Sequence, residues 1–111
     1  MQLAGHLSGI RHYKNDEMLI NDYYGSVNDA MEFFKYDTLL HKPGTKYHYS
    51  THAWTLISLI IENTSKSEFL SFMNTEVFAP LKMNDTQAEL QAVDNDLVKF
   101  YQFNSSRDTF E

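Results

Sequence analysis

Tyr49 is the residue whose type and setting best suit it for chemistry in this chain. It follows the turn-forming pair Pro43-Gly44 and precedes an apolar run from Trp54 to Ile61. A phenol has a pKa of about 10 in water, and a nearby lysine ammonium would favour its ionised form and let it pass a proton. A turn before the ring and a helix after it would hold the ring while leaving its oxygen accessible. The alternative is an ordinary aromatic residue packed at a helix entrance, which composition alone favours.

Ser50 and Thr51 follow Tyr49 directly and have two interpretations. Hydroxyl side chains at the start of a helix accept hydrogen bonds from its free backbone amides, so capping alone explains both residues. The functional interpretation gives Thr51, with Ser50 beside it, a hydrogen bond to a substrate. From the residues alone, capping is the simpler of the two.

The chain contains five histidines, which are His6, His12, His41, His48 and His52. His48 and His52 are four residues apart, a spacing that suits a metal ion on a helix. The residues between them lack the glutamate of a zinc-protease helix, and no third ligand follows at a suitable spacing. We therefore expect no metal site and no cofactor, and we interpret His6 as a hydrogen-bonded structural residue.

No complete nucleophilic site can be assembled from the sequence. A Gly-x-Ser-x-Gly elbow is absent, and so are Ser-x-x-Lys, Lys-Thr-Gly and His-Thr-Gly. The residues around Tyr49 therefore look like one part of an active site.

Bulk composition excludes several classes of function. At 111 residues, one domain at most is expected, and 42% hydrophobic residues suffice for a core. A net charge of -6 argues against nucleic acid and anionic membrane surfaces as partners. The absence of cysteine excludes disulfides and thiolate sites. No apolar stretch reaches the roughly 18 residues that span a bilayer, and no targeting segment is visible.

Local patterns predict a mainly helical chain. We expect a short helix over Leu3 to Leu7 and a second one from about Ser26 to Tyr36, capped by Ser26. An apolar and therefore mostly buried helix is predicted from about Thr51 to Asn63, with Trp54 in the core. A third helix is expected from near Ser65, ending at Pro80. Residues 97–103 are β-prone, so they predict a strand.

Two groups of motifs resemble the serine β-lactamase-like family, which includes class C β-lactamases, certain penicillin-binding proteins and related esterases. Leu3 to Ile10 is similar to its Leu-x-x-His-x-Ser-Gly-Ile segment. Pro43-Gly44-Thr45 through Tyr49-Ser50-Thr51 resembles the Tyr-x-Asn motif with its usual lead-in, and Val77 to Thr86 resembles the Phe-x-Pro-Leu-x-Met-x-x-Thr segment. Within the family, the resemblance points to mitochondrial animal members.

The resemblance implies a mainly α fragment of an α+β β-lactamase/transpeptidase-like fold, with a β-strand near the C-terminus. Residues 1–111 would be a single partial domain, with the Ser-x-x-Lys nucleophile before it and the sheet motif after it. Tyr49 would be the catalytic proton carrier, and Thr51 with Ser50 would hold the substrate. Thr51 stands where the family has asparagine, so it offers a hydroxyl in place of a two-headed amide. Lys66 stands where a Ser-Gly pair is common.

The implied function is acyl-enzyme hydrolysis of a peptide or ester by a serine hydrolase, with the isolated chain inactive. Mitochondrial location follows from the same resemblance. The alternative is a non-catalytic helical module for interaction or assembly. Without the family's sheet, we expect the chain to expose apolar surface and to be prone to form a homo-oligomer.

Overall fold

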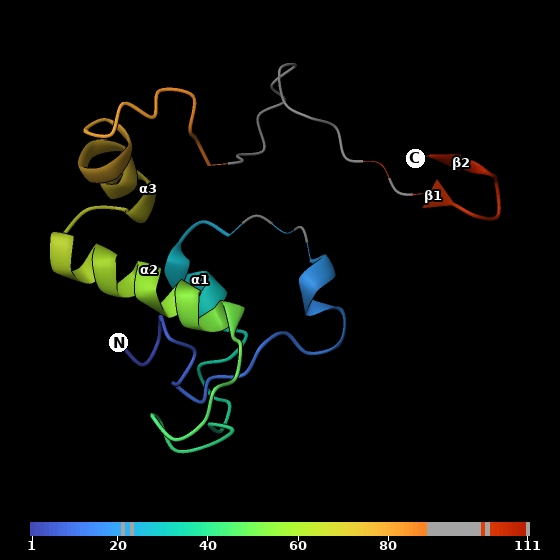
Figure 1. The fold of residues 1–111 in the computed structure, drawn as a ribbon, viewed down its shortest axis with the longest axis horizontal. Helices are drawn as coiled ribbons and strands as arrows, with labels where there is room; N and C mark the ends of the chain where they lie inside the picture. Colours follow the sequence, from blue (N-terminus) through green and yellow to red (C-terminus); the bar gives the residue numbers. More distant parts are fainter. Residues whose placement is uncertain (21, 23, 89–100, 102, 111) are drawn as a thin grey trace.

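The computed structural model describes residues 1–20, 22, 24–88, 101 and 103–110. Its longest element is the central helix α2, Thr51–Ser65. The shorter helices α1 and α3 contact α2, and the N-terminal segment lies beneath its first turn (Figure 1). The other helical elements are the 3₁₀ helix Asn15–Leu19, α1 over Val27–Met31, α3 over Phe69–Met73 and a π-helical turn over Asn74–Phe78.

Helix α2 confirms the helix predicted from Thr51 and extends it by two residues, to Ser65. Ser50 is its N-cap, with a side chain that accepts a hydrogen bond of 3.1 Å from the amide of Ala53. The helix ends at Lys66, which adopts the left-handed conformation with φ 60° and ψ 29°. A lysine thus takes the role that glycine usually fills at this position of a helix end.

Helix α1 begins where predicted and ends earlier. Ser26 caps it by accepting from the amide of Asp29 at 3.3 Å. The α-helix stops at Met31 and turns follow it up to Tyr36, so the predicted end at Tyr36 is wrong for the α-helix. In the turns that follow, the Phe33 carbonyl accepts a hydrogen bond of 2.6 Å from the guanidinium of Arg11. The helical ladder is already irregular before Phe33, since the amide of Phe34 bonds to the carbonyl of Met31, three residues back, at 3.1 Å.

The third helix begins later than the prediction from Ser65. Ser65 is the last residue of α2, and the left-handed Lys66 turns the chain before α3 starts at Phe69. The carboxylate of Glu62 accepts a hydrogen bond of 2.9 Å from the amide of Phe69, so α2 itself caps α3. The end of the helical region is close to Pro80, as predicted, since residues 79–82 form turns.

The segment Leu3 to Leu7 forms turns, so the short helix predicted there is wrong. His6 adopts a left-handed φ of 57°, which no α-helix tolerates in its interior. The His6 carbonyl accepts from the amide of His48 at 2.9 Å, far along the chain. The His6 carbonyl thus bonds to a distant segment and not to an amide of a local helix.

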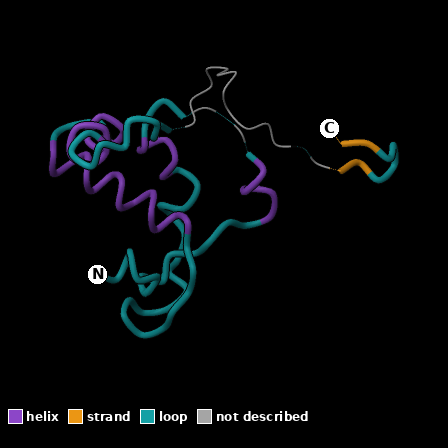
Figure 2. The backbone as a smooth tube through the Cα atoms, turned by 45° about the horizontal axis from the view of Figure 1, so that its top comes forward, coloured by secondary structure: helices purple, strands orange, loops and turns teal. Residues whose placement is uncertain are grey.

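Two loops pair along their length beneath α2 and together hold its first turn (Figure 2). The carbonyls of Gly9 and Leu7 accept from the amides of Leu40 and Gly44, each at 2.8 Å. Gly9 has a φ of 80°, and a Cβ there would lie 2.4 Å from the carbonyl oxygen of His41. Only glycine fits this close approach of two backbones.

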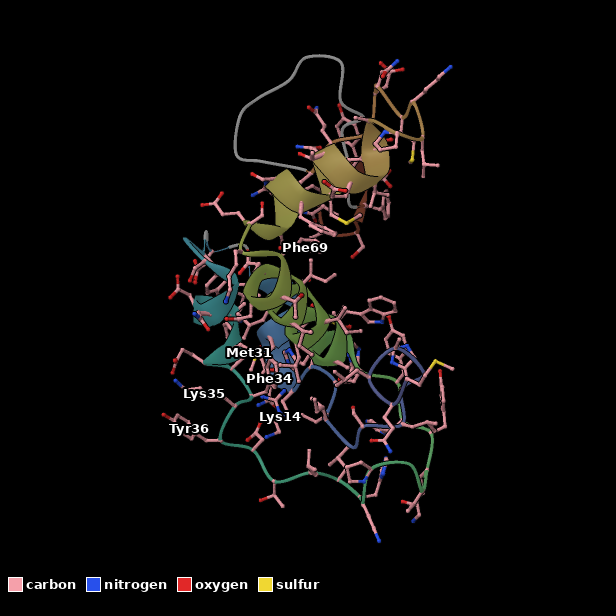
Figure 3. The ribbon with its side chains drawn as sticks, turned by 90° about the vertical axis from the view of Figure 1, so that its left-hand side faces the viewer. Lys14, Met31, Phe34, Lys35, Tyr36 and Phe69 are labelled. Atoms are coloured by element: carbon pink, nitrogen blue, oxygen red, sulfur yellow. The ribbon has the colours of Figure 1, made fainter. Side chains whose placement is uncertain are left out.

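Helix α2 is less buried than its apolar sequence predicts. Only His52 and Ala53 of this helix are buried, and Trp54 is 49% exposed, so its predicted place in the core is wrong. The described chain covers the side of α2 that meets α1, where Phe34 is 7% exposed and lies close against the helix (Figure 3). Trp54 and Ile60 of α2 remain about half exposed.

Two short strands, β1 over Phe103–Asn104 and β2 over Thr109–Phe110, form an antiparallel hairpin. Most of the strand predicted over 97–103 lies outside the described residues, and its last residue, Phe103, belongs to β1. Tyr101 is described and lies outside a strand. No described helix is long and apolar enough to cross a membrane.

Candidate active site at the start of helix α2

Tyr49 lies immediately before the N-cap of α2, with its ring between two histidines. The ring centroids of His6 and His12 are 4.6 Å and 5.1 Å from that of Tyr49. The side chain is still 52% exposed. The ring of Tyr49 therefore contacts two imidazoles while about half of the residue stays exposed.

The same two histidines hold the backbone that follows Tyr49. Nδ1 of His6 accepts from the amide of Ser50 at 3.2 Å, and Nδ1 of His12 accepts from the amide of Thr51 at 3.4 Å. These amides belong to the helix start, where no helical carbonyl is available to them. Because Nδ1 accepts in both cases, each neutral ring carries its hydrogen on Nε2.

Ser50 is fully buried, at 0% exposure, and the geometry supports the capping interpretation of this residue. Its hydroxyl accepts from the amide of Ala53 and donates to the carbonyl of Arg11 at 2.7 Å. Both the donor and an acceptor position of the side chain are used within the chain. Ser50 therefore anchors the turn that carries Tyr49.

Thr51 is the first residue of α2 and is partly exposed. Its Oγ1 lies 3.1 Å from Nδ1 of His12, closer than the amide of the same residue. Tyr49, Ser50 and Thr51 thus form one continuous stretch, and His12 contacts the first and third of them.

A buried arginine, Arg11, bonds to several of the segments around this stretch. The sequence predicted no role for it. It is 6% exposed, and its two Nη atoms donate to the two carboxylate oxygens of Glu17 at 2.6 Å and 2.9 Å. Nε donates to Asp37, while Nη1 donates to the carbonyl of His12 at 2.8 Å. A planar guanidinium with five N–H groups is the side chain that can make this many fixed contacts.

His52 completes the network on the first turn of α2. Its Nε2 lies 3.1 Å from Nη1 of Arg11. The same nitrogen lies 3.5 Å from a carboxylate oxygen of Glu17, so the imidazole contacts both partners of this ion pair. Phe34 stacks on the imidazole at 4.5 Å, and Tyr13 meets it edge-on at 5.1 Å.

The charges and the burial of these side chains shift their pKa values. Hydrogen bonds from Arg11 hold the pKa of Glu17 at about 2, well below its ordinary range. The pKa of Asp37 is also lowered, again mainly by Arg11. Burial lowers the pKa of His52, and the positive charge of Arg11 adds to the effect. Near neutral pH the network is therefore one cation with two carboxylates and an uncharged imidazole.

A cavity of about 210 Å³ adjoins this network on the side of α1. Tyr49 and Thr51 do not line it, so it is separate from the stretch that carries them. Its walls are mostly aromatic and aliphatic, and they are formed by Tyr13, Glu17, Ile20, Tyr24, Ala30, Phe33, His52 and Thr55.

Within the described residues, no group of three or more histidine, cysteine or acidic side chains is arranged to hold a metal ion. The pair His48 and His52 does not form the helical ligand pair that its spacing allows. His48 precedes the helix and is exposed, whereas His52 is buried against Arg11.

The sequence predicted His6 to be a hydrogen-bonded structural residue, and its bond with the amide of Ser50 confirms this. It gave no partner for His6, and it predicted no role for His12 or Arg11. Their contacts join positions 39 to 44 residues apart, such as Ser50 with Arg11 and with His6. The one signal in the sequence was that all three lie in or beside the Leu3 to Ile10 segment, which carries the resemblance.

Comparison with known proteins defines the class of this fold. The structure resembles that of a penicillin binding protein from Bacillus halodurans with a TM-score of 0.85 at 21% identity, covering 99% of this chain and 35% of that one. The chain belongs to the beta-lactamase family, since the family model described as Beta-lactamase matches residues 1–97.

Curated relatives agree with the family. The human serine beta-lactamase-like protein LACTB, mitochondrial, is 29% identical over 96 residues, which are 86% of this chain and 17% of the relative. The human putative beta-lactamase-like 1 is 32% identical over 91 residues, or 80% of this chain and 18% of the relative. The chain thus spans less than a fifth of the length of these relatives. The fold class expected from the sequence, a mainly α part of a β-lactamase-type fold, is confirmed.

Proposed function

We propose that this chain is the helical part of a serine hydrolase of β-lactamase type and contributes Tyr49 to its active site. In this proposal residues 1–111 are a partial domain. The nucleophilic serine and its lysine belong to sequence before Met1, and the sheet motif belongs to sequence after Glu111. The reaction is acyl transfer from a peptide or ester to the serine, followed by hydrolysis of the acyl-enzyme.

The observation that carries this proposal is the setting of Tyr49. Its ring is braced by His6 and His12 and is half exposed, whereas the backbone behind it is fastened by buried hydrogen bonds. A proton carrier needs a fixed position together with an accessible oxygen. In this proposal, the lysine that activates Tyr49 is that of the nucleophile motif Ser-x-x-Lys, which these 111 residues do not contain.

Thr51 is the residue that we assign to the substrate. It is partly exposed and lies two positions from Tyr49, on the rigid first turn of α2. Ser50 supports both residues from behind, because its own hydroxyl is used within the chain. No cofactor is part of this mechanism.

Location and partners follow the same proposal. A relative that covers 86% of the chain is named as mitochondrial, and we propose the same compartment for this protein. The partner at the site is a peptide or ester substrate. With a net charge of -6, the chain has no general affinity for nucleic acid.

Labelling with a fluorophosphonate tests where the nucleophile lies. The 111-residue chain alone is expected to stay unlabelled, and a full-length protein that includes the preceding sequence is expected to be labelled at the serine of Ser-x-x-Lys. A label on any serine of the 111-residue chain would contradict the proposal. So would a full-length protein in which no serine reacts.

A second candidate function is a non-catalytic module that binds another protein or a second copy of itself. The observation in its favour is the apolar surface on α2 and beyond, where Trp54, Ile60, Leu70, Leu81 and Met83 are exposed. Sedimentation measures whether the chain forms an oligomer, and binding of a hydrophobic dye measures whether its apolar surface stays exposed. Together these two measurements separate the candidates. A stable homo-oligomer with no dye binding, from a gene that encodes no Ser-x-x-Lys, would favour the module over the hydrolase.

A further inference from the structure

The hydrogen-bond partner of the Thr51 side chain decides whether this hydroxyl can donate a hydrogen bond to a substrate or only accept one. Its Oγ1 lies 3.1 Å from Nδ1 of His12, and its own amide points at the same nitrogen at 3.4 Å. An amide N–H can only donate, so Nδ1 is the acceptor. If Nδ1 carried a hydrogen, that hydrogen would face the amide hydrogen of Thr51.

The consequence concerns the single hydrogen of the Thr51 hydroxyl. Because Nδ1 accepts, the Oγ1–H group is the donor in the shorter contact, and the hydroxyl has no other hydrogen to give. What remains on Oγ1 is acceptor capacity alone. An asparagine at this position would offer a donor and an acceptor together.

His12 is itself held in place, which makes the orientation of the Thr51 hydroxyl a fixed property of the site. Its carbonyl accepts from Nη1 of the buried Arg11 at 2.8 Å. Its ring lies between Tyr13, at 4.8 Å, and Tyr49, at 5.1 Å. The imidazole therefore cannot turn away from Thr51 without breaking several contacts.

We propose that His12 is a specificity-determining positioning residue, which fixes Thr51 as a hydrogen-bond acceptor toward the substrate. The preferred acyl donors are then those that present an N–H or O–H group to Thr51, such as peptides with an amide N–H next to the acyl group. This inference rests on the proposed function for its substrate, although the hydrogen bond itself does not.

Nitrogen-15 NMR of the histidine rings in the 111-residue chain tests the hydrogen bond directly. With neutral rings, Nδ1 of His12 should be unprotonated and should shift toward the value of an unbonded nitrogen in Thr51→Val. Thr51→Ser should restore the original shift. Ser58→Ala is the matched control, since Ser58 is another hydroxyl of α2 that donates within the helix, to the carbonyl of Trp54 at 3.1 Å. A protonated Nδ1, or a signal that Thr51→Val leaves unmoved, would overturn the proposal.

A pair of substrates tests the selectivity in the full-length protein. The two differ only in whether the group facing Thr51 is N–H or an oxygen atom. We expect kcat/KM to favour the N–H compound by roughly two- to tenfold, the value of one neutral hydrogen bond. That ratio should fall toward one in Thr51→Val. It should also fall in His12→Phe, which frees the Thr51 hydrogen. Equal ratios in all three proteins would overturn the proposal.

The two proposals fail in different ways. If Tyr49→Phe leaves acylation unchanged while Nδ1 of His12 responds to Thr51→Val, the assignment of Tyr49 fails and the hydrogen bond stands. If Nδ1 does not respond, the role of His12 fails whatever Tyr49 does.

Discussion

At the scale of single residues, Arg11 has the most consequences for the site. Its side chain joins Glu17, Asp37 and the carbonyl of Phe33, and its own carbonyl receives the hydroxyl of Ser50. One residue therefore links the loop before α1, the turns after it and the cap of α2. The position of Tyr49 depends on this buried cation, although the two side chains do not touch.

Arg11→Met should destabilise the chain by about 2 kcal/mol, because it removes the donor to the carbonyls of His12 and Phe33 and to the partly buried Glu17. Urea unfolding measures the loss. Lys35→Met is the matched control, as it removes the ion pair of Lys35 with Glu32, which lies on the outer surface (Figure 3). That change should cost no more than about 1 kcal/mol. Equal losses in the two variants would contradict the role given to Arg11.

At the scale of elements, the ends of α2 explain how the site is built. The N-terminal end is fastened by Ser50, His6 and His12, and the C-terminal end turns through Lys66. At the N-terminal end, the amides of Ser50 and Thr51 bond to histidines from a distant segment. The C-terminal end serves to reverse the chain toward α3.

Lys66→Gly should stabilise the chain by about 1 kcal/mol, because a side chain with a Cβ is strained at a φ of 60° and glycine is not. Lys66→Ala keeps the Cβ and serves as the control, with no gain expected. Thermal or urea unfolding of the three proteins gives the comparison. A glycine variant no more stable than the alanine variant would show that the left-handed turn carries no strain.

The elements also show what the sequence can predict. Ser26 and Ser50 were recognised as helix starts because a cap is encoded within three residues. The end of α1 was not, because no glycine or proline directly follows Met31 to mark it. The left-handed end at Lys66 carried no glycine to mark it. For the site, the stretch Tyr49 to Thr51 was visible, whereas its partners His12 and Arg11 required tertiary structure.

At the scale of the whole molecule, the chain has more apolar surface than its own elements cover. Trp54 and Ile60 of α2 are exposed, and the hairpin of β1 and β2 contacts none of the described helices. A helix with this sequence suits a position between layers. The proposal that other sequence completes the domain accounts for this surface.

Stability of the whole chain should fall in two steps as the pH is lowered. Below about pH 6.5 the unfolded chain protonates His52 while the folded chain does not, because burial lowers the pKa of that residue. Below about pH 4.5 the unfolded chain protonates Glu17, whose folded pKa is about 2. In both windows the unfolded state binds more protons, so stability is lost on acidification. Unfolding free energies across the range measure this, and Glu17→Gln should weaken the second step. A flat profile from about pH 7 to pH 3 would contradict the network.

The central claim, that Tyr49 carries the proton in acylation, is tested most directly by the single-turnover acylation rate of the full-length protein. Tyr49→Phe is expected to slow acylation by roughly 10² to 10⁴. Tyr47→Phe, which removes a neighbouring exposed phenol whose ring lies 5.8 Å from that of His6, should leave the rate close to that of the unmodified protein. A Tyr49→Phe protein that acylates as fast as the Tyr47→Phe protein would contradict the account.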